Sequence, residues 1–227
     1  MNRHDLALLC PRAQLHFLDQ NLPAVVYQTI QHWVEQGIPM TICRQDHQPA
    51  GQIKLAMSCF IKARKYRIAF TVNPTDIIEI QSPVLLSQIL QDFDLGLQAQ
   101  LKKFMQSLSQ LDCQVYVYGS YAHQYLTQLA YVSPSSDLDM LLYPKQYDEK
   151  TITEILKQVQ LLQSHTSQAI DGEIKIHPHW QVSFNELQFA RQHGQPHVIG
   201  KGIQEIALLE LQQLWEQFND QCSACTS

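Results

Sequence analysis

Apolar and polar residues alternate in part through the early chain. The runs 40–44, 52–60 and 66–72 are rich in β-branched and aromatic residues and are separated by glycine, proline and basic residues. This pattern is typical of β-strands. Residues 24–36 are predicted to form a helix that Gly37 ends. The first part of the chain is therefore expected to be β-rich.

The rhythm changes towards alternating helices and strands further along. Ser82 and Pro83 give a helix-start signal, and residues 95–111 carry apolar positions at helical spacing. The later elements expected are a strand at 115–118, a helix at 121–129, a strand at 137–143, a helix from the capping box Thr151–Glu154 to about 163, a strand at 169–177, a helix opened by the capping box Ser183–Glu186, and a last helix carrying Ile206, Leu209, Leu211, Leu214 and Trp215.

These elements predict two domains and a tail. A β-rich N-terminal domain is expected at 1–90, a domain of mixed helices and strands at 91–220, and a tail at 221–227. The tail contains Cys222 and Cys225 as a CxxC pair, which is either a frayed end or half of a zinc site.

Composition narrows the classes of function. The chain has 227 residues, of which 45% are apolar, enough to bury a core. Its net charge of −5 argues against a general nucleic-acid coat, which needs a strong positive excess. A small polyphosphate ligand stays possible, because a metal ion and a few local cations can supply the countercharge.

No apolar run approaches the roughly 20 residues that a membrane-spanning helix needs. The apolar run near the N-terminus is also too short for a signal peptide. We therefore expect a cytoplasmic protein without membrane association, whose cysteines are reduced.

Two aspartates begin the strand at 137–143. Residues two apart on a strand point to the same face, so Asp137 and Asp139 are expected to project side by side. Such a pair is repulsive unless a cation lies between the carboxylates. Hard oxygen ligands suit Mg²⁺, and paired carboxylates are typical of metal-assisted phosphoryl chemistry. The alternative is a strand end with two solvated aspartates.

The segment before this strand favours the chemical interpretation. Gly119 and Ser120 follow the strand at 115–118 directly and precede a helix. Glycine lets the backbone approach a ligand closely, and Ser120 with the free N–H groups of a helix start can hold a phosphate. A Gly-Ser pair alone would be an ordinary turn, but here it is followed by the Asp-x-Asp strand.

This arrangement resembles a known signature. Residues 117–120, followed after a short helix by residues 136–139, are similar to the nucleotidyltransferase superfamily of the DNA polymerase β type. The resemblance implies a mixed sheet flanked by helices, so the expected fold class is α+β or α/β. It also implies a third acidic residue on a later neighbouring strand. Asp171 is favoured for that role, and Glu173 on the same strand face is its close alternative.

A narrower resemblance covers most of the chain, because it includes residues 3–6 and the β-rich stretch that ends at residues 83–86 as well as the later motifs. The segments 118–127, 136–141, 171–173 and 197–201 occur in one order that is similar to the malonate decarboxylase holo-[acyl-carrier-protein] synthases, also called phosphoribosyl-dephospho-CoA transferases. This resemblance implies transfer of the 2′-(5″-phosphoribosyl)-3′-dephospho-CoA group from its triphosphate precursor, triphosphoribosyl-dephospho-CoA. The acceptor implied is a serine of the malonate decarboxylase acyl-carrier subunit, and diphosphate is released.

The resemblance also implies residue roles. Asp137, Asp139 and Asp171 are the expected catalytic residues and Mg²⁺ ligands, with Asp171 either completing the metal site or taking the proton of the serine hydroxyl. The residues expected to bind the substrate are Gly119, Ser120, Glu173, Lys201 and Arg67.

Several cations and one histidine keep two interpretations each. Residues Lys62 to Arg67 form a basic cluster that either binds substrate phosphates or an acidic carrier, or is a solvated strand edge. Lys201 either reaches the triphosphate or caps a strand end. His123, on the short helix after Ser120, is either a substrate contact or a structural histidine.

Three rival functions remain. Another nucleotidyltransferase, one that adenylylates a small molecule or a protein hydroxyl, would keep the same metal residues. A non-catalytic carrier-binding module would keep only the fold. A nucleic-acid enzyme is disfavoured by the negative net charge and the lack of a long basic stripe, so no nucleic-acid partner is expected.

Overall fold

The computed structural model describes residues 1–61 and 64–216, and the chain forms two compact units. Unit 1 contains Met1–Pro83, Ala122–Tyr131 and Gly202–Glu205, and unit 2 contains Val84–Tyr121, Val132–Lys201 and the described residues from Ile206 onwards. The domain boundary near residue 90 stays a prediction. The pair Cys222 and Cys225 lies outside the described residues.

Unit 1 is built on a six-stranded antiparallel sheet with the order β2-β5-β4-β3-β1-β6. Helix α1 packs on this sheet through Val26, Ile30 and Val34, which share its buried core. The β-rich interpretation of this part is confirmed. Its elements are β1 (Leu6–Leu9), β2 (His16–Phe17), α1 (Ala24–Glu35), β3 (Met40–Ile42), β4 (Ile53–Ile61), β5 (Arg64–Val72), the 3-10 helix η1 (Pro74–Asp76) and β6 (Ile77–Gln81).

Unit 2 is built on a seven-stranded mixed sheet with the order β13-β12-β11-β10-β9-β8-β7. Strands β9 and β10 are parallel, and the other neighbours are antiparallel. The α+β fold class with a mixed sheet is confirmed. The elements are β7 (Val84–Leu85), the 3-10 helix η2 (Leu86–Asp92), α2 (Leu95–Ser109), β8 (Cys113–Val117), α3 (Gly119–Thr127), β9 (Leu138–Pro144), α4 (Glu149–His165), β10 (Ile170–His177), β11 (Trp180–Ser183), α5 (Phe184–Gln192), β12 (His197–Lys201) and β13 (Ile206–Glu210).

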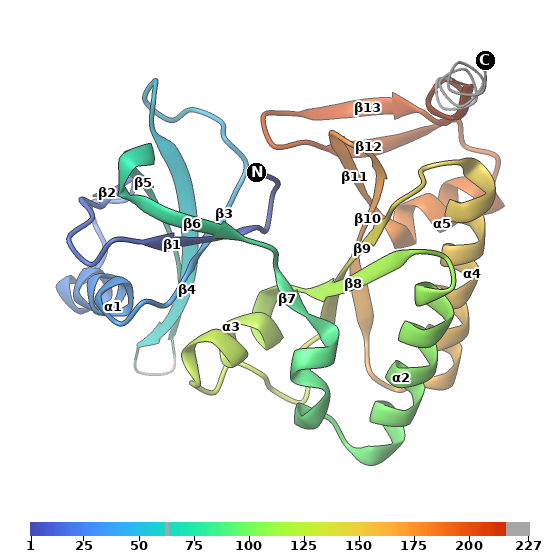
Figure 1. Ribbon diagram of the computed structural model, residues 1–227, viewed down its shortest axis with the longest axis horizontal. Helices are drawn as coiled ribbons and strands as arrows, with labels where there is room; N and C mark the ends of the chain where they lie inside the picture. Colours follow the sequence, from blue (N-terminus) through green and yellow to red (C-terminus); the bar gives the residue numbers. More distant parts are fainter. Residues whose placement is uncertain (62–63, 217–227) are drawn as a thin grey trace. The chain divides into compact units, whose positions relative to one another are not determined.

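Helices α2, α4 and α5 of unit 2 lie side by side along its sheet (Figure 1). Gln100 of α2 donates to the carbonyl oxygen of His165 in α4 at 2.6 Å, and Arg191 of α5 forms an ion pair with Glu149 of α4 at 3.0 Å. On β9, Leu138 and Met140 are fully buried. Since side chains alternate along a strand, Asp139 points to the opposite face of the sheet from these two residues.

Three local expectations were wrong. Ser82 and Pro83 do not start a helix, because the chain first pairs with β8 as β7 and turns helical only at Leu86. Helix α4 begins before the expected capping box, with Asp148 as N-cap accepting the N–H of Thr151 at 2.9 Å. Residues 206–210 form the strand β13, and the last helix begins at residue 211.

None of the described helices combines the length and the apolar character that spanning a membrane requires.

Candidate active site

Three segments of unit 2 meet at one edge of its sheet: the end of β8 and the starts of β9 and β10. Val117 of β8 pairs with Met140, and the N–H of Tyr118 donates to the carbonyl oxygen of Asp139 at 3.1 Å. On the other side of β9, Asp171 of β10 is the register partner of Asp139. The fold therefore brings the Gly-Ser segment, the Asp-x-Asp strand and the third acidic position together.

Gly119 and Asp139 occupy one small space. The backbone of Gly119 has a φ of +65°, which residues with a side chain rarely adopt. A β-carbon at this position would collide with the Oδ2 oxygen of Asp139. Glycine is therefore required here for two reasons, its φ and the lack of space for a side chain. Because Gly119 has no side chain, the Asp139 carboxylate lies directly against the start of α3, where Ser120 follows.

Asp137 and Asp171 are both exposed at this edge. Asp137 immediately precedes β9, two residues before the half-buried Asp139. The Oδ1 oxygen of Asp171 accepts hydrogen bonds from the N–H of Gly172 at 2.8 Å and from Asn185 Nδ2 at 3.0 Å. Asn185 is held in turn by Gln163 at 2.9 Å. The Asp171 carboxylate is thus oriented from α5 and α4.

The fit of a divalent cation differs among these aspartates. In the described parts of the chain, no three histidine, cysteine, aspartate or glutamate side chains form a group that could hold a metal ion. The three-carboxylate site therefore stays a prediction. Asp137 and Asp139 offer oxygen donors of the kind that Mg²⁺ prefers, and Gly119 leaves space for one of them. Asp171 instead bonds to Asn185.

Gln168, which the sequence did not single out, connects the three segments. Its Nε2 donates to the carbonyl oxygen of Ser136, next to Asp137, at 2.7 Å. Its Oε1 accepts from the hydroxyl of Tyr121, next to Ser120, at 3.3 Å. Burial, with a contribution from Asp92, raises the pKa of Tyr121, so the phenol stays protonated as a donor. In a chain with many scattered glutamines, no local signal marks this one.

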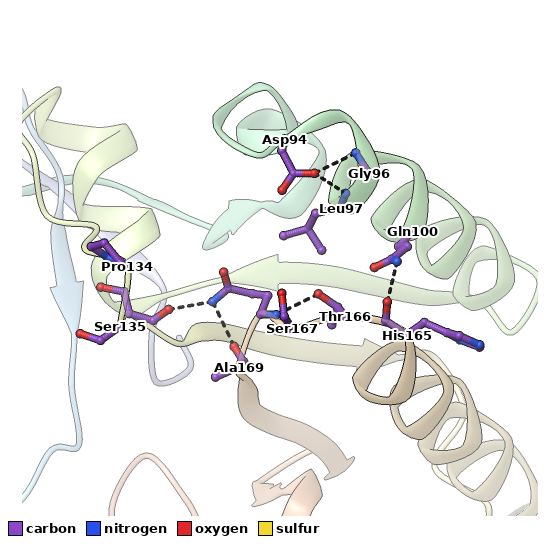
Figure 2. Close-up of a pocket in the computed structure, with 12 residues that line it drawn as sticks. Asp94, Gly96, Leu97, Gln100, Pro134, Ser135, His165, Thr166, Ser167 and Ala169 are labelled. Atoms are coloured by element: carbon purple, nitrogen blue, oxygen red, sulfur yellow. Dashed lines mark hydrogen bonds between the residues drawn. The ribbon is translucent and has the colours of Figure 1, made fainter.

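A pocket of about 390 Å³ adjoins the loops that lead into β9 and β10 (Figure 2). The Asp94 carboxylate at its rim is already used, because it accepts the N–H groups of Gly96 and Leu97 at 2.8 and 3.0 Å. The described lining residues include hydroxyls, amides and His165 but no lysine or arginine. This pocket suits neutral polar groups better than a triphosphate.

The alternative acidic residue, Glu173, has a different environment. It lies two residues beyond Asp171 on β10 and is only 4% exposed. Its Oε1 forms an ion pair with Lys201 Nζ at 2.9 Å. Of the two acidic candidates on β10, Asp171 is the exposed one at the sheet edge, and Glu173 is buried against a lysine.

Arg67 and His123 belong to unit 1. Arg67 is exposed on β5 opposite Ser58, and Lys62 lies outside the described residues. The ring of His123 lies 5.6 Å from that of Tyr131, and its buried Nδ1 has no hydrogen-bond partner among the described residues. Burial, with a smaller effect of Lys65, lowers the pKa of His123 to about 4, so the imidazole is neutral at neutral pH.

Comparison with known families covers almost the whole chain. The family described as "Phosphoribosyl-dephospho-CoA transferase MdcG C-terminal domain" matches residues 85–212, and the corresponding N-terminal domain matches residues 2–83. This chain belongs to the phosphoribosyl-dephospho-CoA transferase family. We call Gly119, Asp137, Asp139 and Asp171 the acidic edge. These residues lie within the C-terminal match, and Arg67 lies within the N-terminal one.

Individual relatives carry the same family name. The phosphoribosyl-dephospho-CoA transferase of Xanthomonas axonopodis pv. citri (strain 306) is 28% identical over 77% of this chain and 79% of its own length. That of Xanthomonas campestris pv. campestris (strain 8004) is 30% identical over 65% and 68%. That of Bradyrhizobium diazoefficiens is 25% identical over 93% and 91%. No solved structure matches the chain significantly.

Proposed function

We propose that this chain transfers the phosphoribosyl-dephospho-CoA group from its triphosphate precursor to a serine hydroxyl of the malonate decarboxylase acyl-carrier subunit. Diphosphate is the leaving group. The proposal is carried by the family match, which spans both parts of the chain, and by relatives whose names describe a transferase of this group. The acidic edge of unit 2 supports it, because carboxylates that can hold a metal ion and backbone N–H groups that bind phosphate are recurring parts of phosphoryl-transfer sites.

In the proposed reaction the serine Oγ attacks the α-phosphorus of the triphosphate. The Oγ–P bond forms, and the bond from this phosphorus to the oxygen bridging to the β-phosphate breaks. Asp171 takes the serine proton. Its Oδ1 accepts hydrogen bonds from Gly172 and Asn185, so in the proposed step the proton goes to Oδ2.

Asp137 and Asp139 would hold Mg²⁺, which when bound offsets the negative charge that develops on the leaving diphosphate. Ser120 and the first free N–H groups of α3 bind oxygens of the triphosphate. The close approach of Asp139 to Gly119 sets the carboxylate beside this phosphate-binding turn. Magnesium dependence is part of the proposal and is tested together with the aspartates.

The test is the intact mass of the purified carrier subunit after incubation with the protein, the precursor and Mg²⁺. The wild type should add one phosphoribosyl-dephospho-CoA group. Asp137→Asn and Asp139→Asn should each slow the transfer by about a hundredfold or more, because removal of one charge-stabilising group commonly costs that much. Chelation of divalent cations should stop the reaction.

A matched control is Asp112→Asn, which removes an exposed aspartate paired with Lys145 on the same unit. This variant should transfer at the wild-type rate. A carrier that gains only an AMP group when ATP is supplied would identify an adenylyltransferase instead. Undiminished transfer by Asp139→Asn would contradict the proposed mechanism.

A further inference from the structure

Five polar side chains from four neighbouring strands gather on the unit 2 sheet, away from the acidic edge. Lys175 of β10 is the register partner of Gln181 on β11, which pairs with Lys201 on β12. On the other side, the pairing of Ile174 with Leu142 sets Lys175 beside Tyr143 of β9. We call Tyr143, Glu173, Lys175, Gln181 and Lys201 the lysine cluster.

Contacts within the lysine cluster cross the strands. Gln181 Nε2 donates to the Tyr143 hydroxyl at 2.7 Å, and Lys175 Nζ lies 5.4 Å from the centre of the Tyr143 ring. Lys201 Nζ reaches Glu173 at 2.9 Å. Gln181, like Glu173, is only 4% exposed. The cluster therefore combines side chains that contact one another across the strands with two members, Glu173 and Gln181, that are buried.

The composition of the cluster favours an anionic ligand. Burying polar and charged groups in a sheet layer costs free energy that apolar side chains would avoid. The five residues contain two ammonium groups and one carboxylate, so the cluster carries one net positive charge in a chain of net charge −5. The Lys201 side chain is 33% exposed and Lys175 is half-buried, so both side chains are partly accessible from solvent.

The distance between the lysine cluster and the acidic edge matches the distance between two anionic groups of the proposed substrate. Asp171, Glu173 and Lys175 alternate onto the same face of β10, and four residues of strand separate Asp171 from Lys175 by about 13 Å. In triphosphoribosyl-dephospho-CoA, two linked pentose rings separate the reacting triphosphate from a second anion, the 5′-diphosphate that joins adenosine to pantetheine. The two anionic groups thus have a spacing of the same order as the two sites on β10.

We propose that the lysine cluster binds the 5′-diphosphate of the dephospho-CoA part of the substrate, with Lys175 as the principal contact. The proposal rests on the proposed function for the identity of the substrate. It assigns the reacting triphosphate to the acidic edge and the non-reacting diphosphate to the lysine cluster. Lys201, held by Glu173, then orders the cluster and contributes a second donor.

The test measures binding of dephospho-CoA, which carries the diphosphate but lacks the triphosphoribosyl group, by titration calorimetry. Lys175→Gln should weaken this binding by about tenfold or more, the effect of losing one charge-assisted hydrogen bond. Lys175→Arg should restore most of it. Binding of inorganic tripolyphosphate with Mg²⁺ should not change in Lys175→Gln, and neither should binding of adenosine, which has no diphosphate.

The control variant is Lys157→Gln, which removes an exposed lysine paired with Glu154 on α4. It should bind dephospho-CoA as the wild type does. In the transfer reaction, Lys175→Gln should raise KM for the precursor about tenfold and leave kcat within about twofold, since the diphosphate contact is equal in ground and transition states.

The outcomes separate the two proposals. The assignment of the lysine cluster would be overturned if Lys175→Gln and the wild type bound dephospho-CoA equally well, or if the wild type did not bind it. Neither result would contradict the proposed transfer to the carrier. A wild type that binds dephospho-CoA through Lys175 yet never modifies a carrier would support the cluster and overturn the proposed function. Unchanged thermal unfolding of Lys175→Gln shows that any loss of binding is local.

Discussion

Gly119 and Asp139 show, at the scale of single residues, how backbone conformation and chemistry depend on each other. Any side chain at 119 meets both an unfavourable φ of +65° and the Asp139 carboxylate. Gly119→Ala should therefore displace the carboxylate and lower kcat by about tenfold or more, while destabilising the fold by roughly 1–2 kcal/mol. Transfer rates and urea unfolding measure the two effects.

Gly194→Ala separates the collision from the backbone strain. Gly194 has a similar φ of +62°, but a β-carbon there has nothing within 4 Å. This variant should lose comparable stability and keep its transfer activity. Equal losses of activity in the two variants would show that strain, and not the position of Asp139, is responsible.

His123 makes the stability of the protein depend on pH. Its folded-state pKa of about 4 lies below the ordinary value of 6.5, because burial and then Lys65 disfavour the charged imidazole. Between these values the unfolded chain binds a proton that the folded chain does not. The stability contribution is therefore fully present above about pH 6.5 and is lost as the pH falls towards 4.

Urea unfolding near pH 7.5 and near pH 5 should reveal this loss. Between these conditions the wild type should lose about 1–2 kcal/mol more stability than His123→Gln, which has no imidazole to protonate. Comparing the two proteins cancels the titration of carboxylates that both contain. Parallel pH profiles would mean that the imidazole is solvated in the folded protein.

At the scale of elements, Gln168 couples α3 to the loops that enter β9 and β10. Gln168→Ala removes both its bond to Ser136 and its acceptor for Tyr121. We expect a kcat about tenfold lower with little change in KM, because small displacements of positioned groups affect the transition state most. Tyr121→Phe, which removes only the second bond, should show a smaller decrease.

The measurement is steady-state transfer to the carrier subunit. Gln163→Ala is a comparison variant that acts on a different part of the site. Gln163 contacts Asn185, which orients Asp171, and not the loop before Asp137. If Gln168→Ala raises KM alone, the amide contributes to the binding surface and does not position the acidic edge.

Local patterns predicted most elements, and they failed where tertiary pairing decides. Strands β4 and β5 and helix α2 were expected, because each is a long run of residues with strand or helical spacing of apolar positions. The run 206–210 satisfies helical spacing as well as strand alternation, and only its pairing with β12 selects the strand. Likewise, Ser82 and Pro83 resemble a helix start, but residues 84–85 pair with β8.

The candidate site could likewise be predicted only in part from the sequence. The spacing of Gly119, Asp137 and Asp139 is visible in the sequence because it lies within two short segments. The contact of Asp171 with Asn185 and the ion pair of Glu173 with Lys201 join different elements. Such contacts join residues that only the tertiary fold brings together, so no local pattern in the sequence specifies them.

At the scale of the whole molecule, unit 1 is not continuous in sequence. The segment Ala122–Tyr131 belongs to it although forty residues separate this segment from β6. Tyr131 is 4% exposed, its hydroxyl donates to the carbonyl oxygen of Ser58 at 2.7 Å, and its ring lies 5.1 Å from that of Phe60. A contact between positions 73 residues apart is invisible to periodicity.

Tyr131 therefore provides a test of whether unit 1 depends on this inserted segment. Tyr131→Ala should destabilise the chain by about 3–5 kcal/mol, as expected for loss of a buried aromatic side chain. Tyr131→Phe should cost about 1 kcal/mol, since it removes only the hydrogen bond to Ser58. Leu129→Ala, in the same segment but with a leucine that is 49% exposed, should be nearly neutral.

A fragment of residues 1–83 extends this test to the whole unit. Because the fragment lacks Tyr131, the carbonyl oxygen of Ser58 and the ring of Phe60 on β4 lose their contacts with this buried side chain. Its unfolding should be less cooperative and its midpoint lower than that of the full chain, as measured by circular dichroism in urea. If the fragment unfolds cooperatively at the midpoint of the full chain, and Tyr131→Ala is no less stable than Leu129→Ala, then the first 83 residues are self-sufficient. The inserted segment would then rest on unit 1 without stabilising it.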